Sequence, residues 1–464
     1  MTKLVKYILK KRKAIIAIAS TIFLSFLAGA HFHKDELWPF GKGYYAVIKD
    51  IKKYGFNFKD IKKAEAEQRA EAARKAEAER KAGGYITRTS TTHLNITEPI
   101  KKNKYNHIAI LNETKTTINF LAATQRKLFL VNLNLQTKKI DETLIYDETL
   151  KNNEITRIND VLVTEDKRIF ISYSSKDHRR YVSPNVSEIL YDKNSKSKQY
   201  KVKKVYRGNY IAPPYGLHQA GGKMIEYSKN EIMLATGDYQ NGFLLDDTKH
   251  KLGKTILINL KNLSTKIYSK GHRNPQGLFY SLSYKKIFET EHGPEGGDEI
   301  NFIQYGKDYG WPDDTYGTIY LEGEKSRNGN DPSRELWSNV GGANFGNHDN
   351  SEKPIFAFIP SIGIKAISQL PPNQYEFPKW KDNFIICSSL GLYRAEITNS
   401  NEPRVIFVEK FGEYKSFGNI IKKDVLQGCR DLAITSDGLI IDNNFRLIKN
   451  KIWIACMHFG IGFN

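Results

Sequence analysis

Short apolar runs separated by polar turns fill the chain after Tyr85. The repeating unit is an apolar run, a polar turn and a second apolar run, as in Asp160-Val-Leu-Val followed by Arg168-Ile-Phe-Ile-Ser. Short runs of this type bounded by turn residues predict strands rather than helices. The unit occurs six times, and its copies begin at His107, Asp160, Lys223, Gly277, Ala366 and Asp431.

The spacing of these units distinguishes two all-β architectures. Six copies at intervals of roughly 50 to 90 residues are typical of the radial repetition of a β-propeller. An irregular β-sandwich is the alternative, but six units exceed what one sandwich of this length usually contains. We therefore predict an all-β, six-bladed β-propeller over residues 85–464.

A different pattern occupies the N-terminus. The basic stretch MTKLVKYILKKRK precedes an uncharged run from Ala14 to Ala30, whose 17 residues are close to the lower limit for a membrane-spanning helix. The basic flank should stay in the cytoplasm, which predicts a single-pass anchor with the propeller on the periplasmic or extracellular side. Alternatively, residues 1–30 are a signal peptide cleaved after Ala28-Gly29-Ala30, and the protein is secreted.

Residues 64–82 read AEAEQRAEAARKAEAERKA and consist of strong helix formers. Glu71 and Lys75 form one of the supportive i,i+4 pairs, and no large apolar stripe is available for a partner helix. We predict a solvated, charged helical stalk within a juxtamembrane region at 31–84, which ends at Gly83-Gly84.

The net charge of +20 would suit a nucleic-acid partner. Residues 1–82 carry 19 Lys/Arg and 9 Asp/Glu, a surplus of 10, so half of the excess lies outside the propeller. The remainder is spread over Lys-rich turns, so we expect no nucleic-acid partner. The three cysteines, Cys387, Cys429 and Cys456, lack C-x-x-C spacing, which excludes zinc and thioredoxin-type motifs. Outside the cytoplasm two of them could pair, and the sequence does not indicate which.

Two polar clusters have the residue types of an active site. His218 lies in a Gly-rich turn, where a neutral imidazole can act as a general base if a carboxylate such as Asp238 orients it. Arg273-Asn274 places a planar cation beside an amide, which suits an anionic or quinonoid ligand. Taken singly, each also fits a structural role, as an exposed loop histidine or a loop salt bridge.

A third cluster extends from Glu291 to Tyr309. The carbonyls of Gly293-Pro294 and the carboxylate of Glu299 form an oxygen-rich set of the kind that calcium prefers. No D-x-D-x-D-G loop is present, which excludes an EF-hand. This spacing alone fits a metal site and a metal-free turn equally well.

Together, the strings GHRNPQGL, EHGPEGGDEIN and DYGWP between Gly271 and Pro312 resemble the signature of a known family. It comprises the soluble quinoprotein glucose dehydrogenases and the aldose sugar dehydrogenases. Those proteins are six-bladed propellers that hold pyrroloquinoline quinone (PQQ) and calcium on one face. The resemblance extends more weakly from His218 to Asp437.

The resemblance implies roles for individual residues. His218 matches the catalytic base that takes the proton of the sugar's anomeric hydroxyl as hydride passes to the quinone. Arg273 and Asn274 match the pair that contacts the quinone oxygens. The remaining matches concern the cofactor and its metal: Gly293 and Pro294 as carbonyls beside the PQQ-bound calcium, Glu299 and Tyr309 as calcium ligands, and Arg430 on a PQQ carboxylate.

Two cationic positions of the family pattern differ in this chain. Gly428 stands where the family has an arginine, and Gly391 stands where it has a lysine. PQQ carries three carboxylates, and each lost charged hydrogen bond costs about 1.5–3 kcal/mol. Arg394 or Lys365 could compensate from nearby in the sequence.

The resemblance therefore implies PQQ- and calcium-dependent oxidation of an aldose outside the cytoplasm, with a sugar as substrate and an external electron acceptor. The alternative is a non-enzymatic, calcium-stabilised propeller that acts as a binding module and has lost part of the PQQ site.

Overall fold

The computed structural model describes most of the chain beyond residue 85. The described residues are 86–89, 94–96, 100, 105–148, 155–177, 181–191, 200–211, 218–246, 249–294, 296–317, 344–345, 348–411, 429–443 and 445–450. They belong to one compact unit, Arg80–Asn464. The predicted anchor at 1–30 and the stalk at 31–84 lie outside them. No helix in the described part is long and apolar enough to cross a membrane.

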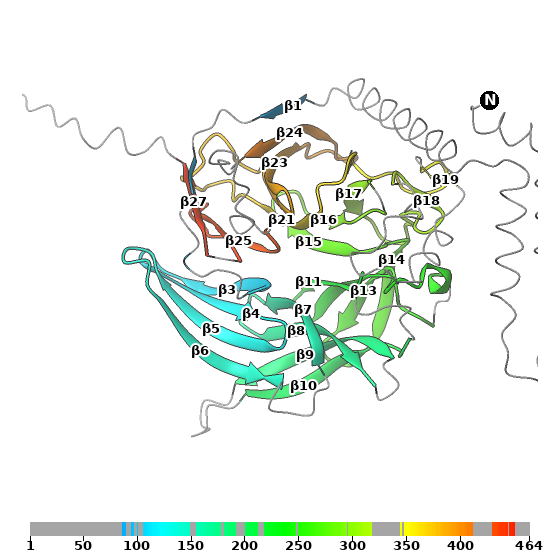
Figure 1. Cartoon of the computed structure of the whole chain (residues 1–464), viewed down its shortest axis with the longest axis horizontal. Helices are drawn as coiled ribbons and strands as arrows, with labels where there is room; N and C mark the ends of the chain where they lie inside the picture. The colour runs from blue at the N-terminus through cyan, green and yellow to red at the C-terminus, as the bar shows by residue number, and fades with distance from the viewer. Residues whose placement is uncertain are drawn as a thin grey trace, which may run out of the picture. The chain divides into compact units, whose positions relative to one another are not determined.

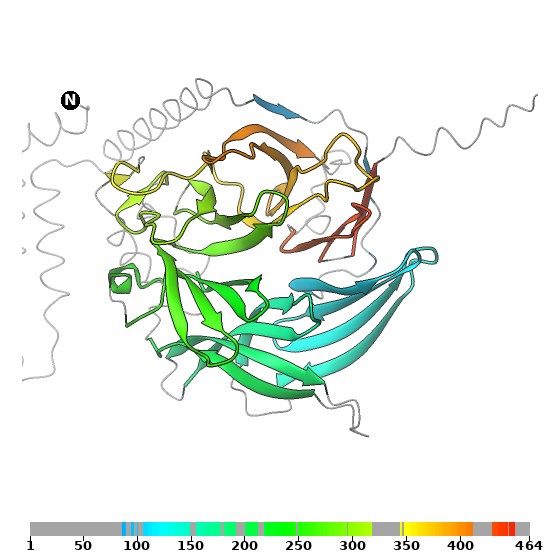
Figure 2. The same cartoon turned by 180° about the vertical axis from the view of Figure 1, so that it is seen from behind.

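Six antiparallel sheets follow one another around a common axis, which confirms the predicted six-bladed propeller (Figures 1 and 2). Successive inner strands contact one another in a closed ring, from β3 through β7, β11, β15, β21 and β25 back to β3. Apart from one short 3-10 helix, η2 (Gly242–Leu244), the described elements are strands.

The blades are numbered from the first inner strand. Blade 1 contains β3 (His107–Glu113), β4 (Thr117–Ala123), β5 (Lys127–Asn134) and β6 (Ile140–Asp147). Blade 2 contains β7 (Ile155–Val163), β8 (Ile169–Lys176), β9 (Val182–Tyr191) and β10 (Tyr200–Arg207). Blade 3 contains β11 (Gly221–Ser228), β12 (Glu231–Thr236), β13 (Lys254–Asn259) and β14 (Thr265–Lys270). Blade 4 contains β15 (Pro275–Ser281), β16 (Lys286–Glu291), β17 (Asp298–Ile303) and β20 (Phe356–Phe358). Blade 5 contains β21 (Ile364–Gln369), β22 (Phe384–Ser388), β23 (Gly391–Ile397) and β24 (Val405–Phe411). Blade 6 contains β25 (Leu432–Ile434), β26 (Ile440–Asp442), β27 (Leu447–Asn450) and β2 (Leu94–Ile96).

Strands from the beginning of the chain complete the last two blades. β2 is the outermost strand of blade 6 and pairs antiparallel with β27, with Leu94 opposite Asn450. β1 (Ile86–Thr89) adds a parallel fifth strand to blade 5 beside β24. A small parallel pair, β18 (Asp314–Thr315) and β19 (Asn344–Phe345), interrupts the connection from β17 to β20. Because blade 6 combines both ends of the propeller sequence, the ring is closed by hydrogen bonds.

The repeating sequence unit corresponds to the first two strands in five of the six blades. Blade 1 is the exception. There the unit joins β3 to β5 and passes over β4, whose sequence TINFLAA supplies the strand between them. The unit was recognised by its apolar character, and Asn119 in β4 interrupts that character without preventing strand pairing.

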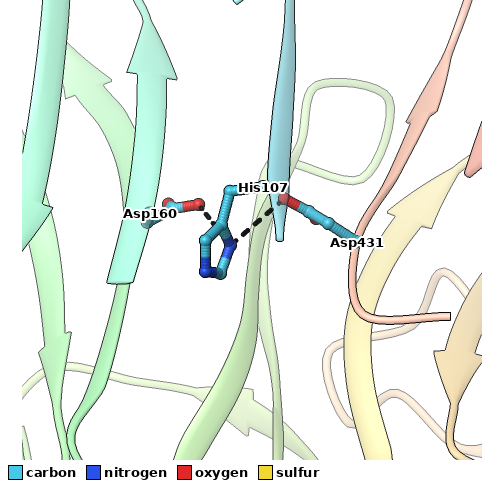
Figure 3. A group of neighbouring side chains, drawn as sticks. All are labelled: His107, Asp160 and Asp431. Atoms are coloured by element: carbon cyan, nitrogen blue, oxygen red, sulfur yellow. Dashed lines mark ion pairs between the residues drawn. The ribbon is translucent and has the colours of Figure 1, made fainter. Parts of the chain in front are cut away.

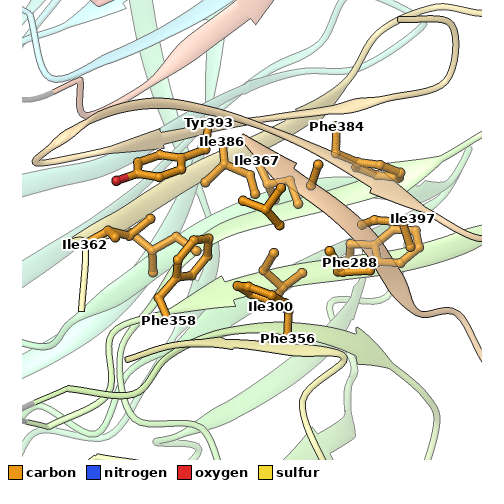
Figure 4. Close-up of a cluster of buried hydrophobic side chains, with 14 residues drawn as sticks. Phe288, Ile300, Phe356, Phe358, Ile362, Ile367, Phe384, Ile386, Tyr393 and Ile397 are labelled. Carbon is orange, nitrogen blue, oxygen red and sulfur yellow. The ribbon is translucent and has the colours of Figure 1, made fainter. Parts of the chain in front are cut away.

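Apolar side chains fill the space between neighbouring blades. The cluster between blades 4 and 5 includes Phe288 and Ile300 from one blade and Phe384 and Ile386 from the next, all fully buried (Figure 4). The rings of Phe288 and Phe384 meet edge to face at 4.8 Å. Complete burial of each such side chain stabilises the fold by about 1.5–3 kcal/mol. These interfaces hold the strand ends of adjacent blades at fixed positions.

A buried ionic cluster joins four blades close to the axis. His107, Asp160 and Asp431 come from blades 1, 2 and 6 and point toward one another (Figure 3). Lys223 of blade 3 donates to Asp160 and to Asp431, at 2.9 Å in both cases. Burial alone would raise the pKa of Asp431, but Lys223 and His107 hold it at about 2. The cluster therefore contains its own cation.

Candidate functional site

The predicted site residues lie on one face of the propeller, which we call the site face. In an antiparallel blade, the start of the first strand and the end of the second strand share one edge. His218 precedes β11, Arg273 and Asn274 precede β15, and Arg430 precedes β25. Residues 292–294 directly follow β16. The strand order thus brings segments far apart in the sequence to the same face.

Arg273 is buried and stabilises the turn after β16 through its guanidinium group. Its guanidinium Nη1 donates to the carbonyl of Gly293 at 2.6 Å and to the carbonyl of His292 at 3.0 Å. The guanidinium also lies over the ring of Trp311, 5.2 Å from the centroid. The carbonyl that the resemblance assigns to calcium is therefore engaged by Arg273 in this structure.

The main chain around Arg273 is held by a carboxylate. Glu291 accepts hydrogen bonds from the backbone N–H groups of Arg273 at 2.7 Å and Asn274 at 3.3 Å. The half-buried side chain of Asn274 accepts from Gln276 at 2.9 Å. Only glycine fits at 293, because a Cβ there would lie 2.2 Å from the carbonyl oxygen of Gly297. The turn is thus rigid on both sides of Arg273.

His218 is exposed at the site face, beside a buried network. Its neighbour Gln219 lies between Asp238 and Arg273, and the amide orientation that satisfies both neighbours places its nitrogen 2.7 Å from Asp238 and its oxygen 2.9 Å from Arg273. Asp238 also accepts from Trp311 Nε1 at 2.8 Å. Burial raises the pKa of Asp238 to about 7, although Arg273 acts in the opposite direction. Among the described residues, Asp238 forms no hydrogen bond or ion pair with His218, so the orienting role considered for Asp238 is not observed.

Glu299 and Tyr309 line the same small cavity. It offers about 10 Å³ to the centre of a water molecule, room for one water or one ion. The carboxylates of Glu291 and Asp314 line it as well. The Tyr309 hydroxyl accepts from the backbone N–H of Gln304 and donates to the carbonyl of Phe302, so the carbonyl of Tyr309 is the ligand to expect from this residue.

No motif indicated a partner for Glu299. In the structure His348 Nε2 lies 3.1 Å from Glu299 Oε1, and His348 Nδ1 lies 3.1 Å from the Ser351 hydroxyl. Burial raises the pKa of Glu299, while His348 acts against this shift. His348 lies within the Gly/Asn-rich stretch that follows β19, where no motif marks it.

Cationic side chains from four blades face the same region. Burial lowers the pKa of Arg430, and burial together with Arg430 lowers the pKa of Lys365 to about 8. Burial also lowers the pKa of His292 to about 4, and three cations add to this effect, namely Arg273, Lys365 and Arg430. Arg157 of blade 2, which no motif marked, also has its pKa lowered, by burial and by Arg430. Positive charges that oppose one another suit a ligand with several negative charges.

The structure distinguishes between the two residues considered as substitutes for the missing cations. Arg394 donates to Glu409 at 2.6 Å and to Glu396 at 3.0 Å within blade 5, so it is already paired. Lys365 belongs to the cationic group described above. A further lysine covers Gly391: a Cβ at that glycine would lie 3.2 Å from Lys410 Cε. Gly428 lies outside the described residues.

A disulfide joins Cys387 at the end of β22 to Cys429 before β25, with 5.3 Å between the Cα atoms. It answers the question of pairing that the sequence left open and ties blade 5 to blade 6 at the site face. Cys456 lies outside the described residues.

Loss of this disulfide is expected to destabilise the propeller. Cross-linking positions that are 42 residues apart restricts the unfolded chain, and loss of such a link typically costs about 2–5 kcal/mol. Chemical denaturation of Cys387→Ser/Cys429→Ser should therefore show a lower free energy of unfolding than the wild type. A reductant should lower the stability of the wild type and leave that of the double variant unchanged. An unchanged transition in fully reduced wild type would contradict the prediction.

Parts of the sequence are similar to known sugar dehydrogenases. The aldose sugar dehydrogenase YliI of Escherichia coli (strain K12) is 28% identical over 179 residues, 36% of this chain and 44% of that protein. Quinoprotein glucose dehydrogenase B of Acinetobacter calcoaceticus is 40% identical over 72 residues, 13% of this chain and 15% of that protein. The chain thus matches less than half the length of these curated relatives.

The similarity to solved structures extends over more of the chain than the similarity in sequence. The crystal structure of the soluble aldose sugar dehydrogenase from Escherichia coli in the apo-form has a TM-score of 0.57 at 20% identity, covering 77% of this chain and 99% of that one. The family model for glucose/sorbosone dehydrogenase matches residues 158–441, more than half of the 464 residues. The chain therefore belongs to the glucose/sorbosone dehydrogenase family.

Proposed function

We propose that this protein is a PQQ- and calcium-dependent oxidoreductase that oxidises an aldose at its anomeric carbon. The observation that carries the proposal is the meeting of Arg157, Arg273, Lys365 and Arg430 on the site face of a family propeller. Burial lowers the pKa values of Arg157, Lys365 and Arg430, so each of these cations would gain from an anionic ligand. A tricarboxylate such as PQQ would supply the negative charges, through charged hydrogen bonds and ion pairs.

Bound PQQ would supply a hydride acceptor. His218 would take the proton of the anomeric hydroxyl, and its exposed side chain leaves a sugar free access to it. Arg273 and Asn274 would orient the quinone oxygens, since both are held in place through Glu291. The sugar loses two electrons and two protons, so an external electron acceptor must return the cofactor to its oxidised state.

Calcium would occupy the cavity at Glu299 and Tyr309. The carboxylates of Glu291, Glu299 and Asp314 and nearby carbonyls form the oxygen set that Ca²⁺ prefers. The cavity has room for one ion. Glu299 would then bind the metal in place of His348, or contact both.

The location that fits this function is outside the cytoplasm. A buried disulfide persists in oxidising compartments, which agrees with the apolar N-terminal segment. We propose a single-pass membrane protein with the propeller on the periplasmic or extracellular side, or a secreted protein if residues 1–30 are removed.

Reconstitution tests the proposal. The purified full chain, supplied with PQQ and Ca²⁺, should reduce an artificial dye in the presence of at least one aldose from a panel of hexoses and pentoses. Absence of dye reduction with every sugar, in protein that has taken up PQQ, would refute the activity.

A binding module is the second candidate, and the glycines at 391 and 428 favour it. Calorimetry with PQQ separates the two functions. Micromolar or tighter binding supports the oxidoreductase, and no measurable binding supports the module.

Lys365 should make PQQ affinity depend on pH. Its pKa of about 8 in the free protein means that it carries a charge at neutral pH and loses this charge above pH 8. PQQ affinity should therefore fall as the pH rises from about 7 to about 9, and Lys365→Met should weaken binding at the lower pH by roughly 10- to 100-fold. In the variant the affinity should depend less on pH. The exposed Lys353→Met is the matched control, and an equal loss in both variants would contradict a specific role for Lys365.

A further inference from the structure

Three ligand-type side chains converge in the interior beneath the Arg273–Asn274 turn. His272 belongs to the connection between β14 and β15, and Glu289 and Glu291 belong to β16. His272 and Glu289 are fully buried, and Glu291 is 2% exposed. One ligand atom from each lies within 4.8 Å of the others. His272 Nδ1 is 3.7 Å from Glu291 Oε1 and 4.0 Å from Glu289 Oε2.

Two of these buried polar atoms have no hydrogen-bond partner in the described part of the chain. They are His272 Nδ1 and Glu289 Oε1. The separations of 3.7 and 4.0 Å are too long for hydrogen bonds. A buried polar atom without a partner costs about 1–3 kcal/mol, and more if it is charged. A proton or an ion is needed to satisfy these atoms.

One side-chain amide, that of Asn301, is shared among three of the carboxylates. Asn301 Nδ2 lies 3.1 Å from Glu289, 3.2 Å from Glu291 and 3.3 Å from Glu299. One amide has two protons, so it cannot donate fully to three acceptors. In the described part of the chain, no lysine or arginine forms an ion pair with Glu289 or Glu291.

The ionic cluster at the axis provides a comparison within the same protein. There, one histidine and two aspartates also converge (Figure 3), and Lys223 supplies the cation between the carboxylates. The cluster at His272 repeats the histidine and the two carboxylates without a lysine. The comparison indicates that a cation from solution takes the place of Lys223.

We propose that His272, Glu289 and Glu291 bind a divalent transition-metal ion of the zinc or manganese class. Ligand atoms about 2.1 Å from one ion lie at most about 4.2 Å apart, and the two separations from His272 Nδ1, 3.7 and 4.0 Å, lie within this limit. A mixed set of imidazole nitrogen and carboxylate oxygens suits such ions better than calcium, which prefers oxygen alone.

The surroundings of His272 fix its ring for this role. Nε2 lies 2.8 Å from the Ser269 hydroxyl, which lies 2.6 Å from the Thr255 hydroxyl. With Nε2 protonated and donating to Ser269, the lone pair of Nδ1 faces the carboxylates, as a metal requires. The ring also stacks on Tyr309, with centroids 4.9 Å apart.

This site is distinct from the calcium cavity. His272 and Glu289 do not line that cavity, and Glu291 is common to both. The ion would connect the β14–β15 connection to β16. It would also fix Glu291, which holds the backbone of Arg273 and Asn274. The proposal does not depend on PQQ or on sugar oxidation.

Protonation of buried Glu289 is the alternative explanation for the unsatisfied atoms. Burial and the neighbouring Glu291 raise the pKa of Glu289 well above its usual range, so a protein without the ion would hold a proton on Glu289. The two explanations differ in metal content and in the infrared band of a protonated carboxyl group.

The experiment uses the full chain without PQQ or sugar. Chelator-treated protein is dialysed against Zn²⁺ or Mn²⁺ in the presence of excess Ca²⁺, and bound metal is measured by mass spectrometry. We expect one equivalent in the wild type and in Glu188→Gln, whose buried glutamate pairs with Arg168 elsewhere in blade 2. Glu289→Gln should bind at least about 10-fold more weakly, since even the loss of a residue that only supports a ligand has such an effect. Glu299→Gln should retain the ion.

A spectroscopic measurement on the wild type covers the case in which Glu289→Gln fails to fold. Pulsed electron paramagnetic resonance of bound Mn²⁺ should show coupling to one imidazole nitrogen, unchanged by added Ca²⁺. Equal metal content in the wild type and Glu289→Gln, or absence of nitrogen coupling, would overturn the proposal. A protonated-carboxyl band that Glu289→Gln removes, and that persists in protein dialysed against Zn²⁺ or Mn²⁺, would establish the proton instead.

Discussion

Replacement of His218 by alanine is expected to lower the turnover of the PQQ-loaded protein by about 10²- to 10⁴-fold, the usual contribution of a general base. The side chain is exposed, and within the described residues it makes no hydrogen bond or ion pair. Its removal should therefore leave thermal stability and PQQ affinity unchanged. Steady-state dye reduction, thermal denaturation and calorimetry with PQQ measure the three quantities.

His250 provides the matched control for this experiment. It lies between β12 and β13, a connection that also faces the site side of blade 3, and the proposed reaction does not use it. His250→Ala should retain turnover close to that of the wild type. If His218→Ala also kept turnover within a few-fold of the wild type, another group would have to be the base.

Replacement of Lys223 by methionine is expected to have the largest effect on stability. The ammonium group neutralises two buried aspartates from blades 2 and 6, and its removal leaves them beside His107, a histidine whose pKa burial lowers. Breaking a buried ion pair in this way costs about 3–5 kcal/mol. Denaturant unfolding at neutral pH should show a decrease of this size. Lys127→Met removes the exposed partner of Asp147 in blade 1 and should cost at most about 1 kcal/mol.

The pH dependence of this effect has a defined sign. Burial opposes the charge on Lys223, but Asp160 and Asp431 raise its pKa above the usual value, so its contribution is complete below its unfolded pKa and is lost at higher pH. Asp431 has a lowered pKa of about 2, so its contribution is complete above its unfolded pKa and is lost as the pH falls toward 2. Lys223 and Asp431 therefore stabilise the fold between about pH 4 and pH 10, whereas burial raises the pKa of Asp160, so that this carboxyl favours the fold less as the pH rises.

The Lys223→Met variant should respond to pH in the opposite way on the acid side. Its two uncompensated aspartates would take up protons more readily than in the unfolded chain, so the deficit relative to the wild type should shrink as the pH is lowered. Lys223→Met/Asp431→Asn should recover part of the lost stability. A deficit below about 1 kcal/mol in Lys223→Met would show that the cluster is well solvated after all.

Much of the architecture could be read from the chain. Each of the six recurring units marked the inner strand of a blade, because alternation of apolar and polar residues is a local property. The strand pairing within blade 1 was harder to predict, because β4 carries polar residues that the apolar pattern did not include. The contribution of β2 to blade 6 could not be foreseen, because three residues contain too little pattern to show a partner 350 residues away.

The residues of the candidate site were likewise only partly predictable from the sequence. Motifs marked His218 and Arg273, which lie in compact polar turns, and Glu299, which lies at the start of β17. No motif marked Arg157 or His348, because each is isolated in its own segment and gains its neighbours only from other parts of the fold. Glu289 looked like an ordinary strand residue, and only its burial beside His272 distinguishes it.

The sequence by itself determined the all-β propeller, its six blades and the family to which the site motif points. These properties depend on local periodicity, on repetition and on residues close together in the chain. Only the tertiary structure decided which cations from blades 2, 4, 5 and 6 meet at the site face, which cysteines pair, and which carboxylates are buried without a cation. Those outcomes depend on distances across the ring, and these are fixed only when the packing of the blades and the closure of blade 6 bring the strand ends together.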